Sequence, residues 1–173
     1  MIIDNVASPI AIWRSNCQLS IVYYQFNMIS RAQKYCDYQD RYQQEVRDKL
    51  YSWGAKPDEA EQILCQLVEA DYINEERFAR AFARGKFRIK HWGKNKIRQE
   101  LKFRKISEYC IKQGLSEISD DEYLEILKQV IEKKLRSAGT FATSLQNHKI
   151  AIYTISRGFE ADLVWEMLKA SSQ

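Results

Sequence analysis

The sequence contains few of the residues that interrupt helices, with six Gly and two Pro among 173 residues. Because this scarcity accompanies many Glu, Lys, Arg, Gln and Leu, the composition favours helices over a β-sandwich or barrel. The sequence also lacks an apolar run near the roughly 20 residues of a membrane span, and it lacks a secretory signal pattern. We therefore expect an all-α protein of the cytoplasm with no membrane partner.

Cysteine and histidine are too scattered to indicate a metal site. The sequence has no C-x-x-C pair, and neither histidine lies near a cysteine cluster. We interpret the cysteines as small buried side chains in a reducing compartment. A P-loop is missing as well, and the acids at 120–122 suit the positive end of a helix without a metal. The sequence predicts no enzymatic activity, no cofactor and no metal. The four cysteines and two histidines of the sequence are Cys17, Cys36, Cys65, Cys110, His91 and His148.

Positive charge is concentrated in one segment. From Arg77 to Lys105 there are twelve Lys or Arg and one acid, Glu100, so that this segment carries +11 and the rest of the chain −7. A basic segment in an otherwise acidic protein indicates binding to a polyanion or to an acidic protein surface. A merely solvated helix face would mix both signs. The candidate binding residues are Arg80, Arg84, Lys86, Arg88, Lys90, Lys94, Lys96, Arg98, Lys102, Arg104 and Lys105.

Within this segment the spacing predicts two rows of cations on successive helices. Such rows could straddle phosphates or an acidic groove, and binding would then weaken steeply as salt rises. Phe87 and Trp92 lie among the cations, where they either stack on bases or close a contact between helices. The two rows, each at i, i+4 and i+8, are Arg80, Arg84 and Arg88, and then Lys94, Arg98 and Lys102.

The stretch Met1–Ile29 differs from everything after it. It has no helical periodicity, and it contains a β-prone patch at Ile21–Tyr24. Two interpretations stay open: an irregular or disordered extension, or a translation start at Met28 that places most of the stretch upstream of the true protein.

From Ser30 onward, helix starts alternate with helix stops. Ser30-x-x-Gln33 and Ser119-x-x-Glu122 have the form of capping boxes, and Pro57 suits the first turn of a helix. The apolar stripe expected on the helix after Pro57 consists of Ile63, Leu64, Leu67 and Val68. The other predicted boundaries are Gly54, Asn74, Gly93, Ser107, Gly139 and the turn Arg157-Gly158-Phe159.

The helix pattern recurs three times. Leu50 followed by Ala55 corresponds to Leu101 followed by Ile106, and then to Thr154, a weaker match, followed by Phe159. A three-helix unit of this size buries too little surface alone, so neighbouring units must share a core. The alternative is a chance similarity in helix lengths. The predicted domains are the extension 1–29 and three helical repeats at 30–73, 74–119 (basic) and 120–173.

The junction of the first two repeats resembles the central signature of the RecX family of bacterial recombinase regulators. The residues are Gln66-Leu67-Val68-Glu69-Ala70-Asp71-Tyr72-Ile73-Asn74-Glu75-Glu76-Arg77-Phe78-Ala79, followed by the basic helix and Trp92-Gly93-Lys94-x-Lys96-Ile97. The resemblance covers about Ser30 to Lys169. Ala70 stands where a turn glycine is common, and Lys94 follows Gly93 where proline is frequent, which indicates a divergent branch.

The resemblance implies an elongated, curved array of three three-helix units that acts as a monomer. It further implies binding in the groove of a RecA–single-stranded DNA filament and inhibition of its activities in recombination and the DNA-damage response. Single- or double-stranded DNA is a further candidate partner. Two alternatives stay open: a helical DNA- or RNA-binding protein that docks through the basic middle repeat, and an adaptor whose basic segment binds an acidic protein.

Overall fold

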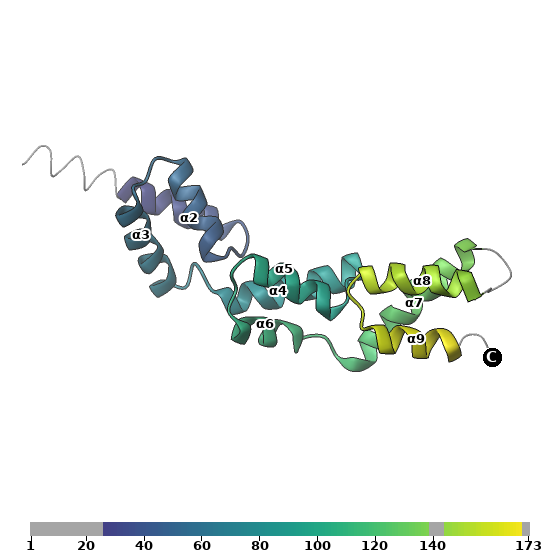
Figure 1. The fold of residues 1–173 in the computed structure, drawn as a ribbon. Coiled ribbons are helices and arrows are strands. Elements are labelled where there is room, and N and C mark those ends of the chain that lie inside the picture. The colour runs from purple at the N-terminus through teal and green to yellow at the C-terminus, as the bar shows by residue number, and fades with distance from the viewer. Residues whose placement is uncertain (1–25, 139–143, 171–173) are drawn as a thin grey trace, which may run out of the picture. The chain divides into compact units, whose positions relative to one another are not determined.

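The computed structural model describes residues 26–138 and 144–170, and every regular element within those ranges is a helix (Figure 1). This confirms the predicted all-α fold class. The chain divides into two compact units, Met1–Ile73 and Asn74–Gln173. In the part of the chain that the structure describes, none of the helices combines the length and apolarity needed to cross a bilayer.

The described part of the first unit, from residue 26, is a three-helix group. It consists of a helix over residues 26–37, α2 (Gln43–Ser52) and α3 (Pro57–Glu69). Val46 and Leu50 are fully buried, as their i, i+4 spacing on α2 predicts. They pack in one apolar cluster with side chains from the other two helices. Each helix thus contributes one apolar stripe to a shared core.

Residues 26–37 are helical, so the chain is already in a helix four residues before the predicted capping box. Ser30 therefore lies inside the helix, and the capping-box prediction at this position is wrong. Met28, Ala32 and Cys36 recur at i, i+4 and i+8 and are all buried, so the apolar stripe extends the helix toward the N-terminus. Residues 26–29 belong to this helix rather than to the irregular extension expected up to Ile29. The β-prone patch Ile21–Tyr24 lies outside the described residues.

Two predictions for α3 are corrected. Val68 is 43% exposed and Cys65 is also exposed, whereas Ile63, Leu64 and Leu67 are buried. A helix advances about 100° per residue, so Val68 lies at the edge of the stripe centred on Ile63 and Leu67. Cys65 points still farther from that centre, which leaves its thiol in contact with solvent.

The cysteines therefore differ in reactivity. Burial raises the pKa of the Cys36 thiol to about 11, so roughly one Cys36 in a thousand is a thiolate at pH 8. We expect iodoacetamide at that pH to alkylate Cys65 well before Cys36, as followed by mass spectrometry of the two peptides. In denaturant the two rates should converge. Equal rates in the folded protein would contradict the burial of Cys36.

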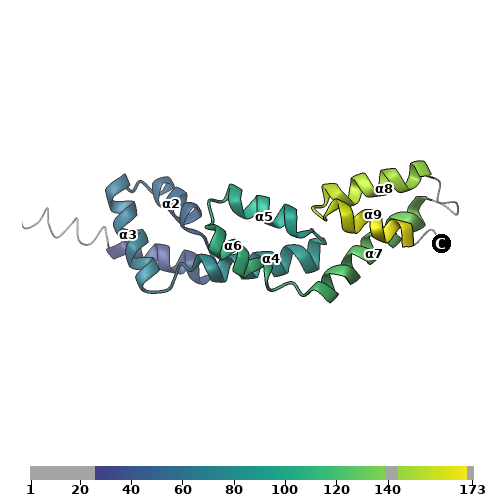
Figure 2. The same cartoon turned by 60° about the horizontal axis from the view of Figure 1, so that its bottom comes forward.

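Six helices lie in the described residues of the second unit, and side-chain caps mark the starts of several of them. The Asn74 side chain accepts a hydrogen bond from the Arg77 N–H, and the Ser107 hydroxyl accepts one from Cys110. The Ser119 hydroxyl accepts the Glu122 N–H at 3.3 Å, as the predicted capping box requires. The helices are α4 (Glu75–Lys90), α5 (Lys94–Phe103), α6 (Glu108–Leu115), α7 (Asp120–Ala138), α8 (Ser144–Ser156) and α9 (Ala161–Ala170). Figure 2 shows α8 and α9 beside α7.

The three-helix pattern repeats in the backbone as well as in the sequence. Gly54, Lys105 and Gly158 each follow the second helix of a group, and each has a positive φ, at 93°, 61° and 95° respectively. Such left-handed residues close the C-terminal end of a helix. Each is followed by a buried apolar residue, and the predicted repeat is thereby confirmed. The boundaries predicted for the three repeats stay predictions.

Thr154 explains why the third repeat is the weakest match in sequence. It takes the place of Leu50 and Leu101, and it is completely buried. Its hydroxyl donates a 2.8 Å hydrogen bond to the Ile150 carbonyl of its own helix. A buried polar group is tolerated when it is hydrogen-bonded in this way. A threonine thus occupies a core position without an unsatisfied hydroxyl.

The second unit is held together where the turn after α8 meets the loop before α5. The Gly93 N–H donates to the Arg157 carbonyl at 2.9 Å, and the Asn95 N–H donates to the Gly158 carbonyl at 3.1 Å. The Arg157 guanidinium donates to the carbonyls of Lys90 and His91. Those carbonyls end α4 and have no partner within the helix. The predicted turn Arg157-Gly158-Phe159 therefore joins two helix groups.

An aromatic stack covers the same junction. The Tyr123 ring lies 5.8 Å from Phe87 and 5.3 Å from Phe159, measured between ring centroids. The Tyr123 hydroxyl donates to Glu160, and burial together with this hydrogen bond raises its pKa. Phe87 is completely buried. Of the two interpretations open for Phe87, the contact between helices is therefore the one that the structure supports.

Candidate filament and nucleic-acid interface

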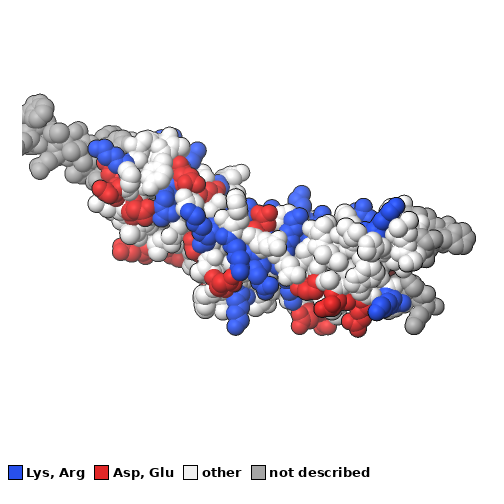
Figure 3. All heavy atoms as spheres, viewed as in Figure 1, with Lys and Arg blue, Asp and Glu red and all other residues white. Residues whose placement is uncertain are grey.

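The basic segment covers α4, the loop around Gly93, α5 and the turn that follows. In the space-filling view, Lys and Arg side chains gather over the middle of the chain (Figure 3). Acidic side chains lie among them, which the linear count of one acid in the segment did not suggest. The candidate cations therefore differ in how far they are already neutralised by the protein itself.

The row of arginines on α4 is paired with carboxylates. Arg80 binds Glu76 at 2.8 Å and also Glu117, and these hydrogen bonds raise its pKa. Arg84 lies 3.9 Å from Glu117, and Arg88 binds Glu122 at 2.8 Å. Glu117 and Glu122 follow α6 and begin α7, far from α4 in sequence. This row connects helices of the second unit and is not a bare cationic edge.

Lys94 also has an intramolecular role. Its ammonium lies 2.9 Å from Asp120 and 4.7 Å from the centre of the Tyr123 ring. Its backbone N–H donates to the Tyr123 hydroxyl at 3.3 Å. The hydrogen bond and the charge of Lys94 lower the pKa of Asp120. The first member of the second predicted row thus contributes to the junction between α5 and α7.

Two lysines enclose Trp92. The Lys86 ammonium lies 5.1 Å from the Trp92 ring centre and the Lys96 ammonium 4.8 Å, both within cation–π range. Neither lysine forms an ion pair within the described ranges 26–138 and 144–170. The indole therefore connects α4 and α5 through two cations.

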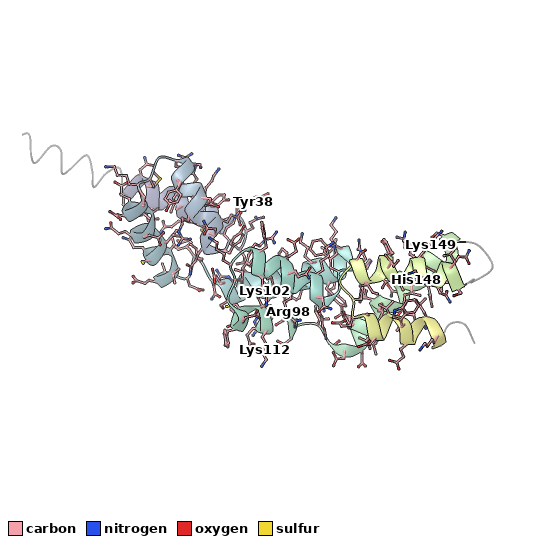
Figure 4. The ribbon with its side chains drawn as sticks, viewed as in Figure 1. Tyr38, Arg98, Lys102, Lys112, His148 and Lys149 are labelled. Carbon is pink, nitrogen blue, oxygen red and sulfur yellow. The ribbon has the colours of Figure 1, made fainter. Side chains whose placement is uncertain are left out.

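Exposed cations with few intramolecular contacts lie on α5 and α6. Arg98 contacts Asn95 at 3.5 Å, and Lys102 pairs with Glu108, an exposed carboxylate. Figure 4 shows Arg98 and Lys102 on α5, with Lys112 below them on α6. We refer to Arg98, Lys102 and Lys112 as the α5–α6 cations. Exposed ion pairs such as that of Lys102 contribute at most about 1 kcal/mol, so a binding partner can displace Glu108 at little cost.

Sequence reasoning missed three features of this region. Lys112 lies outside the basic segment, and Phe103 and Tyr109 are 86% and 63% exposed. The exposure of Phe103 could have been predicted from helical periodicity, because Phe103 lies on the side of α5 opposite the buried Ile97 and Leu101. Large exposed aromatic side chains often mark contact sites.

The remaining predicted binding residues, Arg104, Lys105 and Lys90, lie in three different surroundings. Arg104 pairs with Glu100 at 2.6 Å and its guanidinium lies over the Phe82 ring. Lys105 occupies the left-handed turn after α5, and Lys90 is exposed at the end of α4. Among the described residues, no group of three His, Cys, Asp or Glu is placed to hold a metal.

These observations define a tandem helical-repeat protein whose middle three-helix group carries exposed cations. Residues 74–115, which contain α4, α5 and α6, match the family model described as the second three-helix domain of RecX. The resemblance to the RecX family that the sequence predicted is thereby confirmed, and the chain is similar to RecX regulatory proteins over more than three quarters of its length.

The sequence relatives are bacterial proteins named Regulatory protein RecX. The one from Lactobacillus gasseri is 26% identical over 135 residues, which are 78% of this chain and 50% of the relative. The one from Geobacillus is 28% identical over 138 residues, or 80% and 51%. The chain thus spans about half the length of the curated relatives that it matches.

Two crystal structures share the fold. RecX from Lactobacillus salivarius superimposes with a TM-score of 0.76 at 23% identity, over 84% of this chain and 95% of that one. A second structure of regulatory protein RecX gives 0.81 at 23% identity, over 91% and 77%. The three-helix repeat is therefore an arrangement that solved proteins adopt.

Proposed function

We propose that this chain regulates homologous recombination by binding a RecA–single-stranded DNA filament and inhibiting its activities. The observation that supports the proposal is that the exposed α5–α6 cations lie within residues 74–115, the domain that resembles RecX. The curated relatives are named regulatory proteins, which accords with a role in binding rather than catalysis.

The pairing pattern supports the α5–α6 cations as the binding surface. Arg80, Arg88 and Lys94 are engaged by carboxylates of the same unit. Arg98 and Lys112 form no ion pair within the part of the chain that the structure describes. The Lys102 side chain is 53% exposed although it pairs with Glu108, whereas Lys94 is 23% exposed and packs on Tyr123. A filament presents phosphates and acidic side chains, both of which guanidinium and ammonium groups bind through charge-assisted hydrogen bonds.

Exposed aromatic side chains support the same surface. Phe103 and Tyr109 lie on the two helices that carry the α5–α6 cations. Interfaces commonly combine aromatic anchors with surrounding charge. A protein groove or a base could bury these rings, and either would add apolar contact to the electrostatic attraction.

The test measures the single-stranded-DNA-dependent ATPase of purified RecA while this protein is added. We expect inhibition at fewer than one molecule per RecA protomer, because one bound molecule blocks growth or strand exchange over several protomers. Filament length, followed by electron microscopy, should decrease in parallel. Unchanged ATPase and filament length, alongside tight binding to duplex DNA, would contradict the proposal and favour a nucleic-acid-binding protein instead.

A further inference from the structure

A second group of cations surrounds a groove in the last three-helix group, well away in sequence from the basic segment. One hollow of about 310 Å³ lies between α7, α8 and the end of α4, and Lys133, Lys134, Ser137 and Arg157 line it. A neighbouring hollow of about 240 Å³ shares Lys134, Ser137 and Tyr153 and adds Lys149. Because they share these residues, the two hollows adjoin each other, and we call them together the α7–α8 groove. Figure 4 labels Lys149 on α8.

The cations of this groove lack carboxylate partners. Within residues 26–138 and 144–170, Lys133, Lys134, Lys149 and Arg157 form no ion pair with Asp or Glu. The arginines of α4 have such partners, so the two basic regions differ in kind. Four like charges around one concave surface repel one another, and an anion bound between them would relieve that repulsion.

The donor set suits phosphate. Lysine ammonium groups donate to phosphate oxygens, and Lys133, Lys134 and Lys149 supply three of them here. The Ser137 hydroxyl already donates to the Lys134 carbonyl at 2.8 Å, and Arg157 adds mainly its charge. Tyr153 lies between the two hollows, with the Lys134 ammonium 4.0 Å from the centre of its ring. A single phosphate would occupy one hollow, whereas a chain of phosphates can occupy both.

We infer that the α7–α8 groove binds the phosphodiester backbone of a single-stranded nucleic acid. Hollows of about 310 and 240 Å³ admit the backbone of one strand but not the full width of a duplex. The inference stands on the groove and does not depend on the proposed action on RecA.

The test compares two variants with the same change in net charge. The groove variant is Lys133→Glu with Lys149→Glu, which leaves Arg157 to cap α4. The control variant is Lys34→Glu with Lys128→Glu, at two exposed positions outside the groove. Binding of a fluorescein-labelled oligothymidylate is measured by fluorescence anisotropy from about 50 to about 200 mM salt. Far-UV circular dichroism and thermal unfolding check that both variants fold.

We expect the groove variant to bind the oligonucleotide about tenfold more weakly than the control. Loss of two phosphate contacts should reduce the salt slope by roughly 1.4. Equal affinities and slopes for the two variants would overturn the inference. Stronger binding of a duplex, equally tight binding of poly-glutamate, or saturation by inorganic phosphate alone at the same concentration would also overturn it. RecA is absent from this assay, so the inference and the proposed function can fail separately.

Discussion

Replacing Gly93 by alanine is expected to lower the free energy of unfolding of the second unit by about 3 kcal/mol or more. A Cβ at this position would lie 2.2 Å from the carbonyl carbon and oxygen of Gly158 and 2.3 Å from the nitrogen of Phe159. These are backbone atoms, so no side chain can rotate away. The φ of Gly93 is −73°, a value that alanine adopts freely, which leaves the steric clash as the cause.

The clash would separate the turn after α8 from the start of α5. The hydrogen bonds from Gly93 to Arg157 and from Asn95 to Gly158 would then be lost. The contact between the Tyr123 and Phe159 rings also requires the turn after α8 to lie against the start of α5. The effect is therefore expected in near-UV circular dichroism as well as in the urea midpoint.

Gly85→Ala is the matched control for this measurement. Gly85 lies within α4, and a Cβ there would meet no heavy atom within 4 Å. Because glycine is less favourable than alanine inside a helix, this variant should be more stable than the parent by about 1 kcal/mol. If Gly93→Ala unfolded within 1 kcal/mol of the parent while Gly85→Ala behaved as expected, the close approach of the two glycine segments would be refuted.

Reversing the charge of Arg98 and Lys102 together is expected to raise the concentration needed for half-inhibition of the RecA ATPase at least about tenfold. Each substitution replaces attraction to a phosphate or carboxylate by repulsion, which is costly at close range. Both side chains are exposed, so the far-UV circular dichroism and the thermal midpoint should change little. The ATPase assay with single-stranded DNA gives the measurement.

Lys94 is left unchanged in this variant, although the sequence grouped it with Arg98 and Lys102. Its reversal would place a carboxylate beside Asp120 and against the Tyr123 ring, so lost inhibition would then reflect misfolding. The control carries Lys34→Glu and Lys128→Glu, with the same total charge. Full inhibition by the Arg98 and Lys102 variant, or an equal loss in the control, would show that the α5–α6 cations are not the working surface.

Much of the fold could be predicted from the sequence because its signals are local. The caps at Asn74, Ser107 and Ser119 act on an amide three residues away, and the apolar stripe of α2 is set by the period of one helix. The predicted start at Ser30 was wrong because the apolar pattern through Met28 outweighed a capping motif. The exposure of Cys65 could not be predicted from its residue type, because it depends on which side of α3 the residue occupies.

The candidate interface was predictable only in outline. The charge count located the segment Arg77–Lys105, yet it treated its members as equivalent. Their differences arise from carboxylates outside the segment, such as Glu117, which lies 37 residues from Arg80, and Glu122, which lies 34 residues from Arg88. Helical periodicity cannot predict contacts between residues so far apart in sequence. The α7–α8 groove also escaped notice, because its cations come from separate helices and form no run in the sequence.

Local sequence patterns are enough to establish that the chain is helical, where most helices start and stop, and that the same three-helix unit recurs. These properties follow from hydrogen bonds and spacings within a few residues. Tertiary packing establishes which cations are neutralised, that Gly93 and Gly158 are in contact, and that Lys133, Lys134, Lys149 and Arg157 line the α7–α8 groove. Each of these depends on contacts between residues far apart in the chain, which packing alone brings together.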